Sequence, residues 1–188
     1  MTFSKKKGFS TISLVLCALF AALMAVGAWI SIPMSSGISV TLQLLAIMTC
    51  ASLLEPAQAA LAVTAYELIG MAGLPVFSNF QAGPGVLLGV TGGYLIGFIP
   101  AAFLTSLIIR RRGRELWKQA IAMVLGITVC YAFGSVWFMV SLHRTLGQTL
   151  ALCVIPYLPF DAIKIALSVA LSRALYRPMQ TVLRRFDR

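Results

Sequence analysis

Three ionisable side chains fall inside long apolar stretches of this sequence: Glu67, Asp161 and Lys164. Ionisable groups in apolar surroundings are costly to bury, and they often mark a functional site. Asp161 and Lys164 are three residues apart, so on a helix they share one face. Such a pair either holds a ligand that carries a carboxylate, donors and acceptors, or forms an ion pair that only neutralises itself. For Glu67 the alternatives are a ligand contact and a carboxylate at a helix end.

Two further segments have the composition of a binding site. The stretch Gly89–Phe98 contains four glycines, which weaken a helix and permit close approach by another helix or by a ligand. It is not a nucleotide-binding fingerprint, because no strand–turn–helix unit accompanies it. The preceding stretch, Ala72–Gly85, is crowded with glycine and proline yet remains apolar. We therefore expect a loop that packs onto the bundle or re-enters it.

The usual signatures of enzymes and metal sites are absent from the sequence. The one histidine, His143, rules out a zinc-binding HExxH pair and leaves little basis for a Ser-His-Asp site. No Walker motif is present, so the chain does not hydrolyse ATP by that route. The four cysteines lie in apolar runs without CxxC spacing, and we interpret them as small buried hydrophobes. We expect no enzyme activity, no metal and no cofactor.

The composition indicates a membrane protein. Of the 188 residues, 60% are hydrophobic and only 11% are charged, against about 25% charged residues in soluble domains. So few charges do not cover a water-facing surface, and most of the surface must therefore face lipid. We expect one membrane domain, residues 1–188, with a cytoplasmic segment at 1–9, a helical bundle at 10–176 and a cytoplasmic tail at 177–188. The first apolar run is too long for a signal peptide, and we interpret it as an uncleaved span.

The basic residues predict the orientation of this domain. The net charge is +10, but thirteen of the fifteen basic residues gather in three clusters beside apolar spans. Bases in such places are typical of cytoplasmic loops, which argues against nucleic acid as a partner. The clusters are Lys5, Lys6 and Lys7; Arg110, Arg111, Arg112, Arg114 and Lys118; and Arg173, Arg177, Arg184, Arg185 and Arg188.

The number of spans follows from parity. The N-terminus and the Arg110–Lys118 cluster are both predicted to be cytoplasmic, so an even number of crossings separates them. The apolar block at 40–71 is therefore a hairpin with its tip at Glu55-Pro56. We predict an all-α protein with six transmembrane helices and both termini in the cytoplasm. The spans are Ser10–Ile32, Val40–Leu54, Ala57–Met71, Val86–Ile109, Gln119–Leu142, and a last one from Pro156 or Pro159 to Tyr176.

Small residues recur at intervals of four in the first predicted span. Ala18 and Ala22 form one pair, and Ala21 and Ala25 form another. Small residues at this spacing let a second helix approach closely within a membrane. The pattern fits either a docking surface for another protein or ordinary packing within the chain.

Three motifs follow one another from the loop after the third predicted span into the fourth span: Gly73-Leu74-Pro75-Val76-Phe77-Ser78, Gly83-Pro84-Gly85 and Thr91-Gly92-Gly93-Tyr94-Leu95-Ile96-Gly97-Phe98. A fourth, Pro159-Phe160-Asp161-Ala162-Ile163-Lys164, lies at the beginning of the last span. The first three resemble the core signature of the BioY family, the biotin-specific S components of energy-coupling-factor (ECF) transporters, and the fourth resembles the motif of that family's last helix. The chain departs from the family in one place: the loop after Phe77-Ser78 is often richer in glycine than the Asn79–Ala82 found here.

This resemblance implies the S-component fold in the cytoplasmic (inner) membrane of a bacterium, and high-affinity binding of biotin near the outer surface. It also implies a partner complex of one transmembrane coupling protein and two cytoplasmic ATPase subunits, which supplies the energy of ATP hydrolysis. The docking surface for this complex would be Ala18, Ala21, Ala22 and Ala25.

Biotin needs an apolar, aromatic-lined cavity with a few placed donors and acceptors. Candidate substrate-binding residues are Gln43, Tyr66, Glu67, Phe77, Ser78, Asn79, Phe80, Thr91, Gly92, Gly93, Tyr94, Asp161 and Lys164. Lys164 is a candidate for the carboxylate of biotin and Asp161 for its ureido group, or the reverse. Alternatives are a solitary biotin carrier, an S component for another vitamin, and a membrane-embedded enzyme.

The orientation is testable with a single engineered cysteine. A cysteine placed at Gly113 lies in the middle of the Arg110–Lys118 cluster, so it should react with impermeant thiol reagents only after the membrane is opened. Labelling in intact cells measures this directly. Labelling from outside would contradict the six-span arrangement.

Overall fold

The computed structural model describes residues 10–34 and 37–186, and the described chain is almost entirely helical. The helices are α1 Thr11–Trp29, α2 Gln43–Leu53, α3 Pro56–Met71, α4 Pro84–Leu88, α5 Gly92–Arg112, α6 Leu116–Leu142, α7 Leu146–Cys153 and α8 Leu158–Phe186. Two 3-10 turns, η1 Ser78–Phe80 and η2 Ile155–Tyr157, join them. Two short strands, β1 Ser31–Ile32 and β2 Val40–Thr41, pair antiparallel, with Ser31 opposite Thr41.

Local sequence explains where several helices begin. Helix α3 begins with Pro56 at its first turn, and Glu55 and Gln58 form a capping box around its N-terminus. The predicted break at Glu55-Pro56 is therefore a true helix boundary. A second capping box, between Thr145 and Gln148, begins α7 directly after α6 ends at a left-handed His143.

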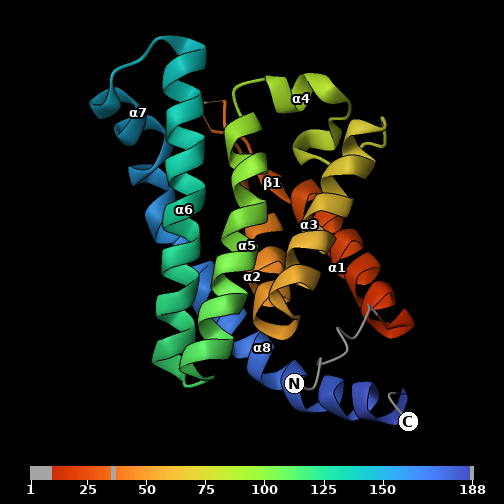
Figure 1. The fold of residues 1–188 in the computed structure, drawn as a ribbon. Coiled ribbons are helices and arrows are strands. Elements are labelled where there is room, and N and C mark those ends of the chain that lie inside the picture. Colours follow the sequence, from red (N-terminus) through yellow and green to blue (C-terminus); the bar gives the residue numbers. More distant parts are fainter. Residues whose placement is uncertain (1–9, 35–36, 187–188) are drawn as a thin grey trace, which may run out of the picture.

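The long helices stand side by side, and α5 and α6 pack along most of their length (Figure 1). Glycine makes this close approach possible. A Cβ on Gly126 of α6 would lie 2.0 Å from Thr105 Oγ1 of α5, and one on Gly97 of α5 would lie 3.2 Å from Cys130 Cα. Lipid gives apolar helices no solvophobic drive to associate, so such close packing stabilises the bundle.

A buried hydrogen-bond network joins α2, α6 and α8. The Gln119 side chain, 2% exposed, accepts hydrogen bonds from Ser52 Oγ at 3.1 Å and Ser172 Oγ at 2.9 Å. Its amide nitrogen donates to the backbone oxygen of Arg114 at 2.7 Å. Every polar atom of the glutamine side chain is thus engaged, as a low-dielectric interior requires.

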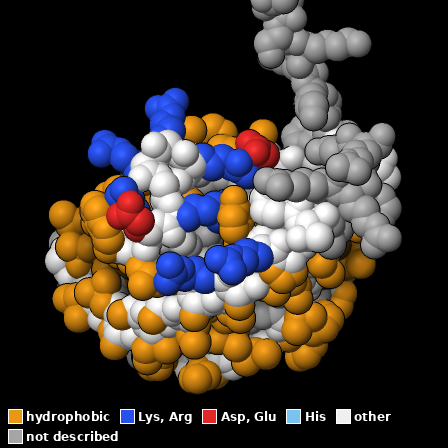
Figure 2. All heavy atoms as spheres, turned by 90° about the horizontal axis from the view of Figure 1, so that it is seen from below, with side chains coloured by type: hydrophobic (Ala, Val, Ile, Leu, Met, Phe, Trp, Pro, Cys, Tyr) orange, Lys and Arg blue, Asp and Glu red, His pale blue; other side chains and the backbone are white. Residues whose placement is uncertain are grey.

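The two ends of the bundle differ in chemistry. One end, here called the basic end, carries the α5–α6 connection and the later part of α8, and Figure 2 shows lysine and arginine side chains gathered on it. The opposite end, here called the loop end, carries β1, β2, η1, α4 and α7 (Figure 1). Between the ends, large apolar side chains such as Val15, Val124 and Val136 are 61%, 48% and 62% exposed, as expected of a lipid-facing belt.

The predicted six spans are matched only in part. Four stretches are long and apolar enough to cross a bilayer by length and composition: Thr11–Trp29, Gly92–Arg112, Leu116–Leu142 and Leu146–Thr181. The predicted hairpin is present as α2 and α3, but with 11 and 16 residues they extend only about 17 and 24 Å at 1.5 Å per residue. Both are shorter than the hydrocarbon core of about 30 Å.

The structure changes two features of the predicted spans. The fourth span does not begin at Val86, because Gly89 is extended and separates the short helix α4 from α5, which begins at Gly92. The connection between the fifth and the last predicted span contains the helix α7. The last helix extends past Tyr176, the predicted end of the last span, to Phe186. Arginine is a good helix former, and a helix continues readily past a membrane boundary, so the end of the span stays a prediction.

Candidate functional site

A buried ion pair lies in the part of α8 nearest the loop end. Lys164 Nζ is 2.8 Å from Asp161 Oδ1, and the two residues are 7% and 6% exposed. The hydroxyl of Tyr131, from α6, donates to the other carboxylate oxygen of Asp161 at 2.5 Å. Both carboxylate oxygens are thus engaged, whereas the described contacts use one of the three ammonium donors of Lys164.

Four buried side-chain atoms have no hydrogen-bond partner in the described chain: Gln43 Nε2, Glu67 Oε1, Ser135 Oγ and Thr149 Oγ1. The first two belong to predicted site residues, and both of these residues are only 4% exposed. A buried donor or acceptor without a partner costs about 1–3 kcal/mol. Such groups therefore indicate a place where a ligand or water completes the bonding.

The unpartnered groups of Gln43 and Glu67 lie in the same half of the bundle as the ion pair. Helices α2 and α8 run side by side, tied by a hydrogen bond of 3.2 Å from Ser168 Oγ to Leu45 O. Lys164 lies one turn before Ser168, and Gln43 is the first residue of α2, so both are displaced towards the loop end. Glu67 lies about one turn before the end of α3. The residues Gln43, Glu67, Tyr131, Asp161 and Lys164 are here called the polar cluster.

Aromatic residues near this cluster anchor the loop that precedes α4. Tyr66 and Phe77 pack edge to face at 5.7 Å between ring centroids, and both are 1% exposed. The Tyr66 hydroxyl donates to Val76 O at 3.1 Å. Phe77 fits against Gly70, where a Cβ would come within 2.2 Å of its ring. Tyr94, 8% exposed, donates to Cys153 O at 3.5 Å.

The side chains of Asn79 and Phe80 connect the loop after α3 to the segment after α1. Asn79 Oδ1 accepts from Ser31 Oγ at 2.8 Å, and its Nδ2 donates to Ser39 Oγ at 3.1 Å. Phe80 stacks on Trp29 with ring centroids 5.4 Å apart and is 62% exposed. Both polar atoms of the Asn79 side-chain amide are therefore hydrogen-bonded to protein. In this structure the two residues fasten loops to each other and do not line an interior cavity.

Thr91, Gly92, Gly93 and Ser78 are not part of the polar cluster. The two glycines accommodate other parts of the chain, since a Cβ would lie 1.6 Å from Leu87 O at Gly92 and 2.2 Å from Trp137 Cβ at Gly93. Thr91 borders a separate pocket of about 410 Å³ at the loop end, which Gln81 and Val86 also line. Ser78 begins η1, and its backbone oxygen accepts from Gln81 N at 3.3 Å.

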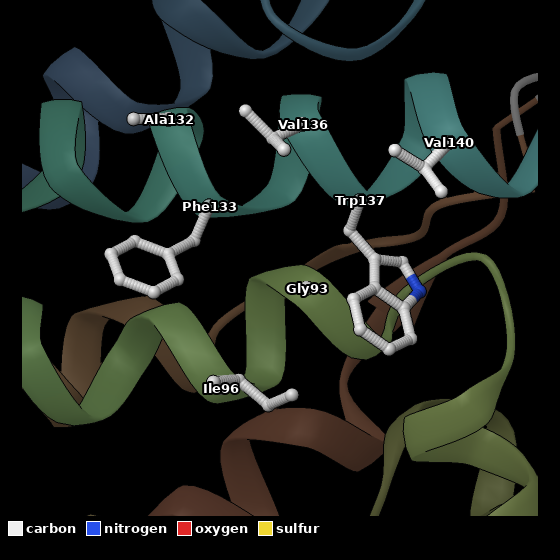
Figure 3. A pocket seen from close by; sticks show the side chains of 7 residues that line it. All are labelled: Gly93, Ile96, Ala132, Phe133, Val136, Trp137 and Val140. Carbon is white, nitrogen blue, oxygen red and sulfur yellow. The ribbon is translucent and has the colours of Figure 1, made fainter.

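An apolar groove of about 510 Å³ lies between α5 and α6 (Figure 3). Its lining residues are Gly93, Ile96, Ala132, Phe133, Val136, Trp137 and Val140. Phe133 and Trp137 point from α6 towards α5 (Figure 3), and the Trp137 indole N–H is already bonded to Gly89 O at 2.9 Å. The groove opens on the lipid-facing surface, where Val140 is 70% exposed. With no donor or acceptor left, it does not suit a polar ligand.

The alanine pattern of α1 divides between the two faces of that helix. Ala21 and Ala25 are 4% and 6% exposed and pack inside the bundle. They therefore do not lie on an exposed face in this arrangement, and their part in docking stays a prediction. Ala18 and Ala22 are exposed on the outer face.

Sequence reasoning missed Tyr131. Its hydroxyl completes the bonding of Asp161, yet nothing near it in the sequence resembles a motif. The available signal was a tyrosine within an apolar span, since a buried hydroxyl in a membrane needs an acceptor.

This geometry defines an integral membrane protein that encloses a polar cluster within a bundle of apolar helices. The sequence model of the BioY family matches residues 3–181, and the chain belongs to the BioY family. The biotin transporter BioY of Thermotoga maritima is 36% identical over 163 residues, which cover 86% of this chain and 94% of the relative. That of Rhodobacter capsulatus is 34% identical over 180 residues, covering 88% and 95%. The relatives are transporters, and the chain is a transport protein and not an enzyme.

A solved structure confirms the fold. The crystal structure of the S-component for biotin from an ECF-type ABC transporter matches with a TM-score of 0.83. It is 24% identical in sequence and covers 93% of this chain and 95% of its own. The predicted S-component fold is therefore confirmed.

The burial of the ion pair leads to a prediction about the stability of the folded protein when one or both charges are removed. Asp161→Asn leaves Lys164 buried without its counterion, and breaking a buried pair in this way costs about 3–5 kcal/mol. The double variant Asp161→Asn/Lys164→Met removes both charges, so we expect it to recover most of that loss. Thermal unfolding in detergent micelles measures both effects. Glu115→Gln, which breaks the exposed pair with Lys118, serves as the control and should change little. A double variant as unstable as the single one would contradict this account.

Proposed function

We propose that this protein binds biotin with high affinity in the polar cluster and serves as the S component of an ECF transporter. The observation that carries the proposal is the presence, in one half of the bundle, of a buried Asp161–Lys164 pair together with the unpartnered Gln43 and Glu67. Its chemistry complements biotin, which has an apolar fused ring, a ureido group with two donors and one acceptor, and a carboxylate. The names of the similar transporters support the same ligand.

Each polar group has an assignment in this proposal. The free ammonium donors of Lys164 meet the biotin carboxylate, since a charge-assisted bond in a dry site is strong. Gln43 Nε2 donates to the ureido oxygen, and Glu67 Oε1 accepts from a ureido N–H. Asp161 holds Lys164 in place and is the second candidate acceptor for the ureido group. The buried rings of Tyr66 and Tyr94 are the proposed apolar walls.

The proposed arrangement has six crossings, with the basic end and both termini in the cytoplasm of a bacterial cell. The basic side chains on one end of the bundle support it. Helices α2 and α3 are then the two short crossings, completed by the segments that flank them. Residues 1–188 form one membrane domain in this proposal, with short cytoplasmic segments at both termini.

The proposed partners are a transmembrane coupling protein and two cytoplasmic ATPase subunits. The chain has no Walker motif of its own, and the matching structure is of a component of an ECF-type ABC transporter. The alternatives are a solitary biotin carrier and an S component for another vitamin. The two experiments below separate them.

Radiolabelled biotin tests the ligand and the site together. We expect binding to purified Asp161→Asn/Lys164→Met to fall by about ten- to a hundredfold or more, because a charged hydrogen bond is worth about 1.5–3 kcal/mol. Glu115→Gln/Lys118→Gln removes an ion pair of 2.7 Å outside the site and should bind like the wild type. Unchanged affinity in the first variant would make Asp161–Lys164 a structural pair. Displacement of biotin by thiamine or riboflavin would instead favour another vitamin.

Tryptophan on the exposed face of α1 tests docking. Ala18 and Ala22 lie one turn apart, and we expect Ala18→Trp and Ala22→Trp to prevent assembly with the coupling protein while biotin binding persists. A bulky ring keeps a partner helix at a distance and removes the close contacts on which association in lipid depends. Co-purification measures assembly, and Val124→Trp, on the lipid face of α6, is the matched control. Loss of biotin binding along with assembly would mean that the two alanines pack internally. Uptake of biotin without assembly would favour a solitary carrier.

A further inference from the structure

A second concave surface lies at the basic end, far from the polar cluster. It is a pocket of about 550 Å³ between the beginning of α6 and the later turns of α8. Arg114, Arg173 and Arg177 line its rim, and Gln119, Ser172 and Tyr176 line the rest. Figure 2 shows the basic side chains of this end on the same face of the molecule.

The charges around this pocket are not balanced. Glu55 and Glu115 are the acidic residues described at this end, and both have other partners: Glu55 pairs with Arg110 at 2.6 Å and Glu115 with Lys118 at 2.7 Å. Within the described side chains, the three arginines of the rim have no carboxylate partner. Burial lowers the pKa of the Arg114 guanidinium, whereas Tyr176 and Glu55 act to raise it and Arg110 to lower it. Positive charge on the rim is therefore not matched by a paired carboxylate among the described side chains.

The pocket is also rigidly built. Gln119 and Ser172, 2% and 1% exposed, are bonded to each other at 2.9 Å and form the floor. The Arg114 guanidinium carbon lies 3.9 Å from the centroid of the Tyr176 ring in a cation–π contact. The fork of an arginine guanidinium matches two oxygens of a phosphate. Arg173 and Arg177, four residues apart on α8, share one face and supply further donors.

The face of α8 above the arginines is apolar. Ala166 and Ala170 precede Arg173 and Arg177 by seven residues, so they lie on the same face two turns further into the bundle. Both alanines are exposed. A smooth strip of this kind leads from the lipid-facing belt directly to the guanidinium groups.

We propose that this pocket binds the phosphate of an anionic phospholipid, whose acyl chains lie along the exposed alanines of α8. The arginines supply the donors for the phosphodiester, and the position at the end of the apolar belt matches the depth of a headgroup. Basic pockets between transmembrane helices at the membrane surface suit such headgroups. A soluble phosphate would make the same polar contacts with the arginines, but it has no acyl chain to pack on the apolar strip.

Native mass spectrometry of the full-length protein in detergent tests the proposal with phosphatidylglycerol and phosphatidylcholine as probes. We expect phosphatidylglycerol to bind preferentially, and Arg173→Gln/Arg177→Gln to weaken that binding about tenfold or more, since each charged hydrogen bond to phosphate is strong. Arg111→Gln/Arg112→Gln removes two exposed charges from the same end, outside this pocket, and should weaken it less than about threefold, as a screened surface field would. Circular dichroism confirms that both variants are folded.

The other outcomes overturn the proposal. Equal losses in the two double variants would mean a diffuse surface field and no site. Equal binding of both lipids to the wild type would mean that the net negative charge of the headgroup is not recognised, and the assignment to an anionic lipid would fail. Inorganic phosphate that displaces phosphatidylglycerol at millimolar concentration would identify a site for a soluble anion, and the lipid assignment would fail.

Discussion

An ammonium group and a carboxylate placed together in the apolar interior impose most of the constraints on this molecule. Neither charge is tolerable alone there, and the pair is tolerable only when its remaining bonding capacity is used. Tyr131 on α6 satisfies Asp161, and the packing of α2 against α8 shields Lys164. The positions of α2, α6 and α8 therefore depend on one another through a single ion pair. The same low dielectric that makes the pair costly strengthens its electrostatic interaction with any charged group brought next to it.

The two halves of the bundle differ in how fully their buried polar side chains are hydrogen-bonded. Towards the basic end, Gln119 is bonded at every polar atom, and Ser106 Oγ donates to Leu54 O at 2.7 Å. Towards the loop end, Gln43 and Glu67 each retain an unpartnered atom. Fully satisfied networks specify a unique packing, and partly satisfied ones leave capacity for another molecule. This contrast supports the placement of the substrate in one half and of structural hydrogen bonding in the other.

The sequence predicted the features that depend on spacing along one helix. Asp161 and Lys164 share a face because they are three apart, and the break at Glu55-Pro56 followed from a helix-starting proline. It did not predict which alanine pair of α1 is buried, because lipid-facing and core-facing positions are equally apolar and both pairs repeat at four. The short helices α4 and α7 were missed for a related reason, since apolar loops and short apolar helices have the same composition. The contact of Tyr131 with Asp161 joins residues thirty positions apart, and nothing local encodes it.

The hydrogen-bonded layer formed by Gln119, Ser52 and Ser172 has a consequence for the cell. All three residues are at most 2% exposed, and they lie between the polar cluster and the basic end. An ion that crossed this layer would have to shed its hydration shell where the polar atoms of Gln119 are already occupied. Such a layer therefore opposes the passage of ions between the two ends of the bundle. It limits the leak that many copies of this protein would add to a membrane that carries a potential.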